Sequence, residues 1–356
     1  GTIPEEIKVL TSLRDLELFS NSVSGTLPAA FATLSNLLFV DLEFNKLTGP
    51  VFPNTVLSMT NLREYRVSFN TLTGNIPTDV NRLSSLEEMW IAENDITGTI
   101  PTQISSLSLE SFLIYGNQIA GSIPTDLGLM FTLTSLDMVN NQLIGTIPSE
   151  LYNLENLQGL FMSRNNFQGA LSTDVGRLTN LIQLWIDQNS FTGTIPTEIG
   201  QLQRIVTLKF ENNTFTGPIP TQVGSLTSLD FFDVSGNALT GNIPTEFFNL
   251  STLRILYLSD NNLVGPIPSN IGSAAALKDL YLDGNTITGN IPSITTGQLP
   301  ALTELLLQDT LLTGSVPASI CDLTTLEAFW TDCAVPPTPP EIICPVGCCT
   351  NCFSQG

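Results

Sequence analysis

The stretch LRILYLSDNNLVGPIP, at residues 253–268, determines the fold, because its pattern recurs along most of the chain. The pattern is L-x-x-L-x-L-x-x-N-x-L-x-G-x-I-P. Its central L-x-L alternates apolar and outward-facing positions with period two, which predicts a short strand with one buried face. We therefore expect each copy of the pattern to supply one strand.

The glycine of this pattern recurs every 23 to 25 residues along the chain, at Gly1, Gly25, Gly49, Gly74, Gly98, Gly121, Gly145, Gly169, Gly193, Gly217, Gly241, Gly265, Gly289 and Gly314. A constant period of this length is the signature of a solenoid, in which each repeat packs against its neighbours. The sequence predicts an α/β-type repeat solenoid, a right-handed superhelix with a long parallel β-sheet on its concave face. We assign residues 1–320 to the solenoid, with about 13 repeats, and residues 321–356 to a cysteine-rich C-terminal cap.

An asparagine follows the strand in almost every repeat, for example Asn213, Asn237 and Asn261. An amide buried at a turn needs hydrogen-bond partners, and stacked neighbours offer backbone carbonyl and N–H groups at the repeat spacing. We therefore interpret this column as structural. Thr310 replaces the asparagine in the last full repeat, and residues 169–172 lack the usual I-P.

The composition excludes several classes of function. The chain of 356 residues has no histidine, 12 basic residues and a formal charge of −21. Too few cations are present for nucleic acid or for an anionic membrane surface. The lack of histidine excludes Ser-His-Asp and Cys-His catalysis. No run of apolar residues is long enough to span a membrane. We predict no catalytic residue, no cofactor and no metal.

The repeat consensus with L-T-G-x-I-P resembles the plant-type leucine-rich repeat of receptor-kinase ectodomains and polygalacturonase-inhibiting proteins, over residues 1–320. The resemblance implies an extracellular or cell-surface scaffold, either secreted or part of a membrane-anchored protein. Members of the family bind peptides, steroids, proteins and glycans, so the resemblance does not specify a ligand. No cysteine-paired cap precedes Gly1, and we expect that the chain is truncated there or that this end is covered.

The cysteines all lie at the C-terminal end, at Cys321, Cys333, Cys344, Cys348, Cys349 and Cys352. An even number clustered there predicts a disulfide-bonded cap and an oxidising compartment, with the connectivity left open. A zinc site formed by the last four is the alternative; the spacing and the lack of histidine disfavour it. The segment around Trp330 and residues 348–353 resembles the C-terminal cap of diatom and algal leucine-rich-repeat proteins. Two glycosylation sequons begin at Asn212 and Asn249, both expected to be exposed.

The middle residue of each L-x-L points to solvent on the concave face, and this column is rich in aromatic residues. Six of its fourteen members are aromatic, against 8% of the whole chain, and all three tryptophans belong to it. Exposed tryptophan and tyrosine favour binding, although stacking across strands to stiffen the sheet is the alternative. With acids and neighbours in adjacent columns, the predicted ligand-binding residues are Trp90, Tyr115, Phe161, Trp185, Asp187, Lys209, Glu211, Tyr257, Tyr281, Asp283 and Trp330.

The leading hypothesis is a non-catalytic, extracellular recognition module that binds a protein, peptide or polysaccharide through the concave face. The first alternative is a self-assembling matrix, fibre or adhesion protein, suggested by the uncapped N-terminal end. Ice binding is a minor alternative, suggested by threonine ladders such as Thr192, Thr216 and Thr240. A calcium site among the acids was also considered, but it would need several converging oxygen ligands.

Overall fold

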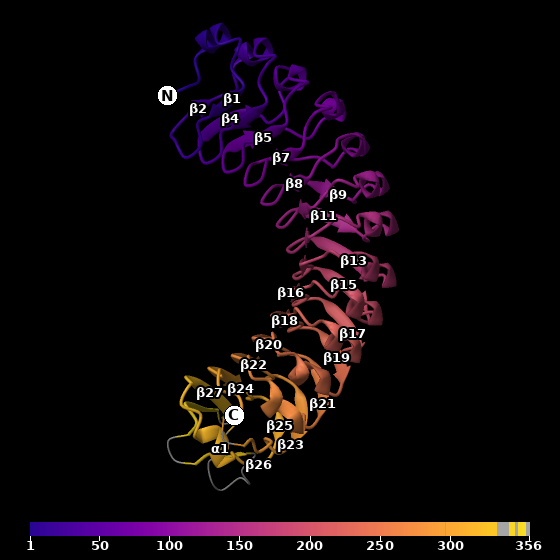
Figure 1. Cartoon of the computed structure of the whole chain (residues 1–356), viewed down its shortest axis with the longest axis vertical. Helices are drawn as coiled ribbons and strands as arrows, with labels where there is room; N and C mark the ends of the chain where they lie inside the picture. The colour runs from indigo at the N-terminus through magenta and orange to yellow at the C-terminus, as the bar shows by residue number, and fades with distance from the viewer. Residues whose placement is uncertain (296, 333–341, 346–347, 354–356) are drawn as a thin grey trace. The chain divides into compact units, whose positions relative to one another are not determined.

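Each repeat forms one turn of chain in the computed structural model of this protein, with a strand, an asparagine turn and a 3-10 helix. The structure describes residues 1–295, 297–332, 342–345 and 348–353. It divides into two compact units, unit 1 (Gly1–Gln168) and unit 2 (Gly169–Gly356), which are described separately. Within each unit the strands of the main sheet lie on one side of the turns and the 3-10 helices on the other (Figure 1).

The main sheet of unit 1 is parallel and follows the chain order β1 (Asp15–Glu17), β3 (Phe39–Asp41), β5 (Glu64–Arg66), β7 (Glu88–Trp90), β8 (Ser111–Leu113), β10 (Ser135–Asp137) and β12 (Gly159–Phe161). The opposite side carries η1 (Glu5–Val9), η2 (Ala29–Thr33), η3 (Val56–Ser58), η4 (Thr78–Arg82), η5 (Thr102–Ser106), η6 (Thr125–Leu129) and η7 (Ser149–Asn153). The sequence pattern did not distinguish these 3-10 helices from other connections.

Unit 2 continues the same plan. Its main-sheet strands are β14 (Gln183–Trp185), β16 (Thr207–Lys209), β18 (Phe231–Asp233), β20 (Ile255–Tyr257), β22 (Asp279–Tyr281), β24 (Glu304–Leu306), β27 (Ala328–Asp332) and β29 (Asn351–Phe353). Its helices are η8 (Thr173–Arg177), η9 (Thr197–Gln201), η10 (Thr221–Ser225), η11 (Thr245–Asn249), η12 (Ser269–Ser273) and α1 (Ala318–Cys321).

A second set of short parallel strands follows the asparagine turns, and the sequence analysis did not predict it. In unit 1 these are β2 (Ser24–Gly25), β4 (Lys46–Pro50), β6 (Thr71–Thr73), β9 (Ala120–Gly121) and β11 (Gln142–Gly145), with β13 (Asn166–Ala170) ending in unit 2. Unit 2 has β15 (Ser190–Gly193), β17 (Thr214–Pro218), β19 (Ala238–Gly241), β21 (Asn262–Gly265), β23 (Thr286–Gly289) and β25 (Leu311–Leu312), while β26 (Gly314–Ser315) and β28 (Ile342–Ile343) form a separate parallel pair. Glycines such as Gly265, with φ +77°, end these strands in a left-handed conformation.

The strand register places equivalent residues of successive repeats side by side. Leu256 pairs with Leu280, and Tyr257 pairs with Tyr281. Both leucines are fully buried, while both tyrosines are half-exposed on the outer surface of the sheet. The predicted alternation is therefore confirmed, and we call the outer surface of the main-sheet strands the strand face.

The asparagine column forms the predicted hydrogen-bond ladder. Asn261 Nδ2 donates to the carbonyls of Val234 (3.0 Å), Leu258 (3.2 Å) and Ser259 (3.0 Å), and Asn261 Oδ1 accepts from the backbone N–H of Leu239 at 3.0 Å. One amide thus connects its own turn to the preceding repeat. Thr310 partly replaces this function, because its hydroxyl donates only to the carbonyl of Leu307.

The C-terminal cap contains the disulfides Cys321–Cys348 and Cys344–Cys349. These bonds use three of the four cysteines of the zinc alternative, which is therefore wrong. Cys333 lies outside the described residues, and only the backbone of Cys352 is described. The disulfide-bonded cap predicted from the sequence is present.

Candidate ligand-binding face

The predicted ligand-binding residues lie on or beside the strand face. Trp90, Tyr115 and Phe161 belong to unit 1 and the others to unit 2. All of them are half-buried except Asp187, which is 5% exposed. The tryptophans are therefore less exposed than the sequence suggested, because neighbouring side chains cover part of each ring, as the contacts of Trp90 and Trp185 illustrate.

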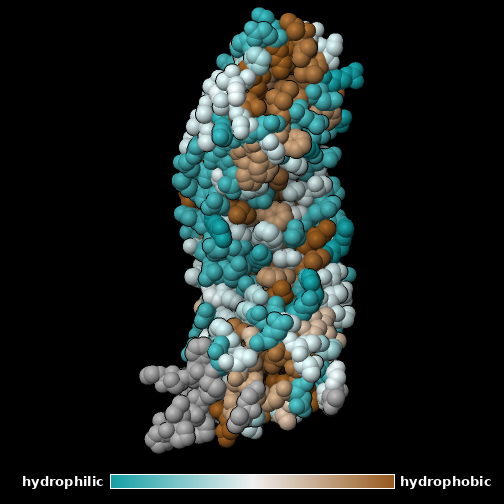
Figure 2. All heavy atoms as spheres, turned by 90° about the vertical axis from the view of Figure 1, so that its left-hand side faces the viewer, coloured by the Kyte–Doolittle hydropathy of each residue, from teal (hydrophilic) through white to brown (hydrophobic). Residues whose placement is uncertain are grey.

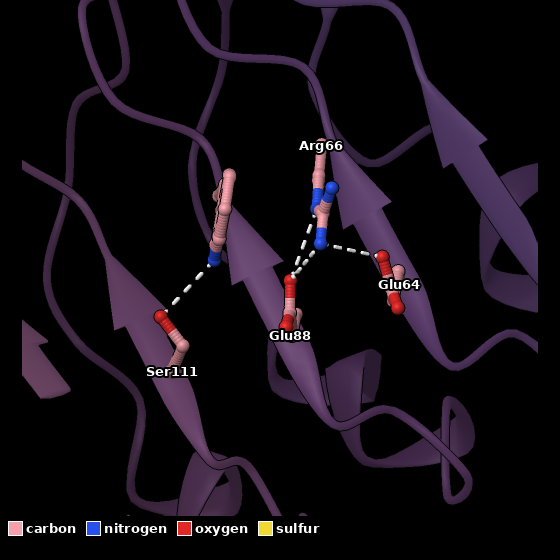
Figure 3. A network of polar contacts seen from close by, with 5 residues as sticks. Glu64, Arg66, Glu88 and Ser111 are labelled. Carbon is pink, nitrogen blue, oxygen red and sulfur yellow. Dashed lines mark hydrogen bonds and ion pairs between the residues drawn. The ribbon is translucent and has the colours of Figure 1, made fainter. Parts of the chain in front are cut away.

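Arg66 covers one face of the Trp90 ring in unit 1. The guanidinium carbon lies 4.1 Å from the ring centroid, a cation–π contact. Arg66 is held there by ion pairs to Glu64 (2.7 Å) and Glu88 (2.6 Å), as Figure 3 shows. On the next strand, Ser111 Oγ accepts a hydrogen bond of 3.0 Å from Trp90 Nε1. These contacts fix the orientation of the ring on the strand face.

Asp137 gives the same face of unit 1 a poorly solvated carboxyl group. Burial raises the pKa of Asp137 to about 6, although the backbone N–H of Val139 donates to its carboxylate at 3.0 Å and opposes the shift. Asp137 pairs in register with Phe161 on β12. A cation placed beside Asp137 would stabilise its charged form.

In unit 2 the ammonium of Lys209 lies between two aromatic rings. Its Nζ is 4.2 Å from the centroid of Trp185 and 5.5 Å from that of Phe231. Trp185 and Lys209 are register partners on β14 and β16, and Lys209 is in turn paired with Asp233 on β18. Lys209 thus shows that a cation fits against the aromatic residues of this face.

Three carboxylates surround that lysine, and their charges exceed its own. Asp187 and Asp233 are 5% and 8% exposed, and both raise the pKa of Glu211. Desolvation is the largest cause, and together these effects bring the pKa of Glu211 to about 7. Glu211 Oε2 is buried and has no hydrogen-bond partner among the described residues. The cluster has a negative potential that one ammonium does not balance.

Two stacked tyrosines extend the strand face of unit 2 beyond this cluster. The rings of Tyr257 and Tyr281 are 4.1 Å apart and 14° from parallel, and the hydroxyl of Tyr281 donates to Glu304. Asp283, in the next column, accepts a hydrogen bond of 2.6 Å from the Ser259 hydroxyl. The cross-strand stacking that the alternative interpretation expects is present for this pair, and both rings remain half-exposed.

A second group of aromatic residues, of which only Tyr115 was predicted from the sequence, lies at the turn beside the strand face of unit 1. The rings of Phe44 and Phe69 stack at 4.2 Å, and the ring of Tyr115 meets Phe69 edge-on at 6.2 Å. The phenylalanines occupy a different column from the tryptophans, one residue before the ladder asparagine. In Figure 2 the hydrophobic surface on this side of the molecule is divided into patches by hydrophilic residues.

Asn212 and Asn249 are both exposed, as expected for their sequons. An apolar surface at the β1 end of unit 1 includes Ile3, Leu10 and Leu16, with Leu10 50% exposed. Among the described residues, no acidic or cysteine cluster has a geometry suited to a metal ion, and no helix is long and apolar enough to cross a bilayer.

The repeats, their asparagine ladder and the capped parallel sheet form a leucine-rich-repeat solenoid, and its repeats are similar to those of plant-type leucine-rich-repeat proteins. The profile of the Leucine Rich Repeat family matches residues 132–154, 180–202, 228–250 and 252–274. Receptor-like protein 36 of Arabidopsis thaliana is 30% identical over 83 residues, which are 23% of this chain and 12% of that protein.

Two solved plant receptor structures resemble almost the whole chain. The peptide hormone receptor RGFR1, in complex with RGF2, has 33% identity and a TM-score of 0.89 over 93% of this chain. The ectodomain of GASSHO1/SCHENGEN3 from Arabidopsis thaliana, in complex with CASPARIAN STRIP INTEGRITY FACTOR 2, has 35% identity and a TM-score of 0.88 over 93%. The chain spans 54% and 40% of these receptor chains.

Proposed function

We propose that this protein is an extracellular, non-catalytic recognition module that binds a peptide or protein through its strand face. The observation that carries the proposal is the column of half-exposed aromatic rings held in place by cations and bordered by buried carboxylates. Rigid aromatic side chains provide large contact area at low entropic cost. The two receptor structures, whose bound partners are RGF2 and CASPARIAN STRIP INTEGRITY FACTOR 2, support a peptide as the ligand.

The electrostatics favour a ligand with positive groups. The chain carries a formal charge of −21, and the strand face includes the carboxyl groups of Asp137, Glu211 and Asp233, whose pKa values are raised mainly by burial. A ligand cation would reduce that penalty, and the Lys209 ammonium already occupies a position of this kind. An oxidising, extracellular location agrees with the disulfides of the cap.

Alanine at Trp90 or at Trp185 is expected to weaken binding of the ligand by about tenfold, because each substitution removes a preorganised ring from the contact surface. Arrays of secreted peptides and of glycans would first be screened on the immobilised protein. Each hit would then be titrated by calorimetry against both variants. Phe131→Ala is the matched control, since Phe131 is 56% exposed and lies next to η6, on the helix side.

Unchanged affinity of every hit for both tryptophan variants would contradict the proposal. Hits confined to the glycan array would assign the face to polysaccharide instead of peptide. Light scattering over a dilution series tests the self-assembly alternative in the same preparation, because a mass that grows with concentration would show self-association, and the apolar β1 end would then be the first surface to substitute.

A further inference from the structure

Two phenylalanines of unit 1 occupy a backbone position that disfavours them. The residue before each ladder asparagine has positive φ in most repeats, and several repeats place glycine, asparagine or aspartate there. Phe44 and Phe69 adopt φ of 53° and 56° at this position. A left-handed conformation is costly for a bulky side chain, and burial compensates little at Phe44, which is 51% exposed. Other repeats place Glu93, Arg164 or Gln188 at the same position, so the backbone conformation does not select phenylalanine there.

The rings form a continuous aromatic ridge, defined by Phe44, Phe69 and Tyr115. Phe44 and Phe69 are stacked with their planes 9° apart, and Tyr115 meets Phe69 at 69°. Ala92 occupies the position equivalent to Tyr115 in the intervening repeat and is fully buried, so its short side chain leaves the edge of Phe69 accessible to Tyr115. The stack leaves much of the Phe44 ring in contact with solvent.

Carboxylates border the ridge. Burial raises the pKa of the Tyr115 hydroxyl, and the charges of Asp137, Glu93 and Glu43 raise it further. Glu43 is itself partly desolvated and faces Asp41 and Glu88, both of which raise its pKa, while Arg66 and a hydrogen bond from Ser68 act in the opposite direction. Arg66 is already engaged by Glu64, Glu88 and the Trp90 ring. Glu43, next to Phe44, is therefore left with two nearby carboxylates and a cation that is already shared with other groups.

We propose that the aromatic ridge binds an extended polypeptide segment through an arginine or lysine side chain that lies over the Phe44 ring. An aromatic face bordered by carboxylates suits a guanidinium or ammonium group through cation–π and charge–charge attraction. The phenylalanine rings offer no hydrogen-bonding atom to a sugar. The inference rests on the proposed recognition function and extends it to a second site, beside the tryptophan column, with a defined partner chemistry.

The test uses the double variant Phe44→Asn/Phe69→Asn, which leaves the net charge unchanged and places asparagine where positive φ is tolerated. A phage-displayed library of random linear peptides would be selected on the full wild-type chain. The selected peptides are expected to be rich in arginine or lysine. Their affinity should fall roughly fivefold to tenfold on the double variant and remain unchanged on Phe131→Asn. Citrulline in place of the critical arginine should reproduce the loss.

Several outcomes would overturn the inference. These are a failure to select any binder, selected peptides without basic residues, and equal affinity for the wild type and the double variant. A melting temperature that falls in the double variant together with the affinity would assign the stack a structural role instead. Peptides that lose affinity with Trp90→Ala but not with the double variant would overturn the ridge while supporting the strand-face proposal. Peptides that lose affinity with the double variant but not with Trp90→Ala would support the ridge and would contradict the strand-face proposal.

Discussion

Replacement of Asn261 by alanine is expected to lower the free energy of unfolding by about 3 kcal/mol, because it leaves several buried backbone groups without partners. The amide is 7% exposed and makes four hydrogen bonds. Alanine cannot replace any of them. The carbonyl of Val234 and the N–H of Leu239 would lose their side-chain partner in the next repeat, so the stacking of two repeats would weaken as well.

Urea unfolding followed by circular dichroism measures this effect, with Asn262→Ala as the control. Asn262 is the next residue along the chain and is exposed, so its substitution should change stability little. Equal losses for the two variants would mean that asparagine at this turn acts through local conformation and not through the ladder. Asn261→Thr is expected to give an intermediate loss, because Thr310 fills the same position with one side-chain hydrogen bond.

The architecture could be predicted from the sequence because each repeat uses the same few interactions. Leu256, Leu258 and Leu263 are fully buried, as the L-x-L and L-T-G positions implied. The asparagine ladder was also predictable, since one buried amide per turn has to find its partners in the repeats that flank it. Because the pattern recurs about every 24 residues, the sequence shows the buried leucine positions and the asparagine position again in each repeat.

The details of the binding face were less predictable, because they depend on side-chain contacts between repeats. Arg66 and Lys209 were members of the same column as the tryptophans, but nothing in their spacing indicated that they would cover Trp90 and Trp185. Phe44 and Phe69 could not be predicted from the column of tryptophans, because they lie outside the middle position of L-x-L. A bulky aromatic residue directly before the ladder asparagine is the feature of the sequence that could have revealed them. The spacing of the cysteines likewise did not determine which of them form disulfides.

Charge and burial on the strand face of unit 2 have a consequence for stability. Desolvation and the nearby Asp233 and Asp187 raise the pKa of Glu211 from 4.5 to about 7, and Lys209 only partly offsets them. The folded state therefore binds a proton at Glu211 more tightly than the unfolded state does. The stabilisation from that proton is complete below pH 4.5 and is lost as the pH rises through about 7.

The Glu211→Gln variant should consequently lose less stability than the wild type when the pH is raised from 4.5 to above 7. The difference in free energy of unfolding is expected to be roughly 2 kcal/mol, after allowance for the partial solvent exposure of this carboxyl group. Urea unfolding at a series of pH values measures it. Glu327→Gln, at an exposed carboxylate, is the control and should follow the wild-type profile.

The same titration connects stability with recognition. A ligand cation that approaches Asp187, Glu211 and Asp233 would favour ionised Glu211, so binding should release a proton near neutral pH and weaken as the pH falls below about 7. In Glu211→Gln this part of the pH dependence should disappear. Parallel stability profiles for the variant and the wild type would mean that Glu211 is solvated in the folded protein. Glu211 would then add no buried charge to the cluster, and a basic ligand would have only the buried Asp187 and Asp233 to neutralise.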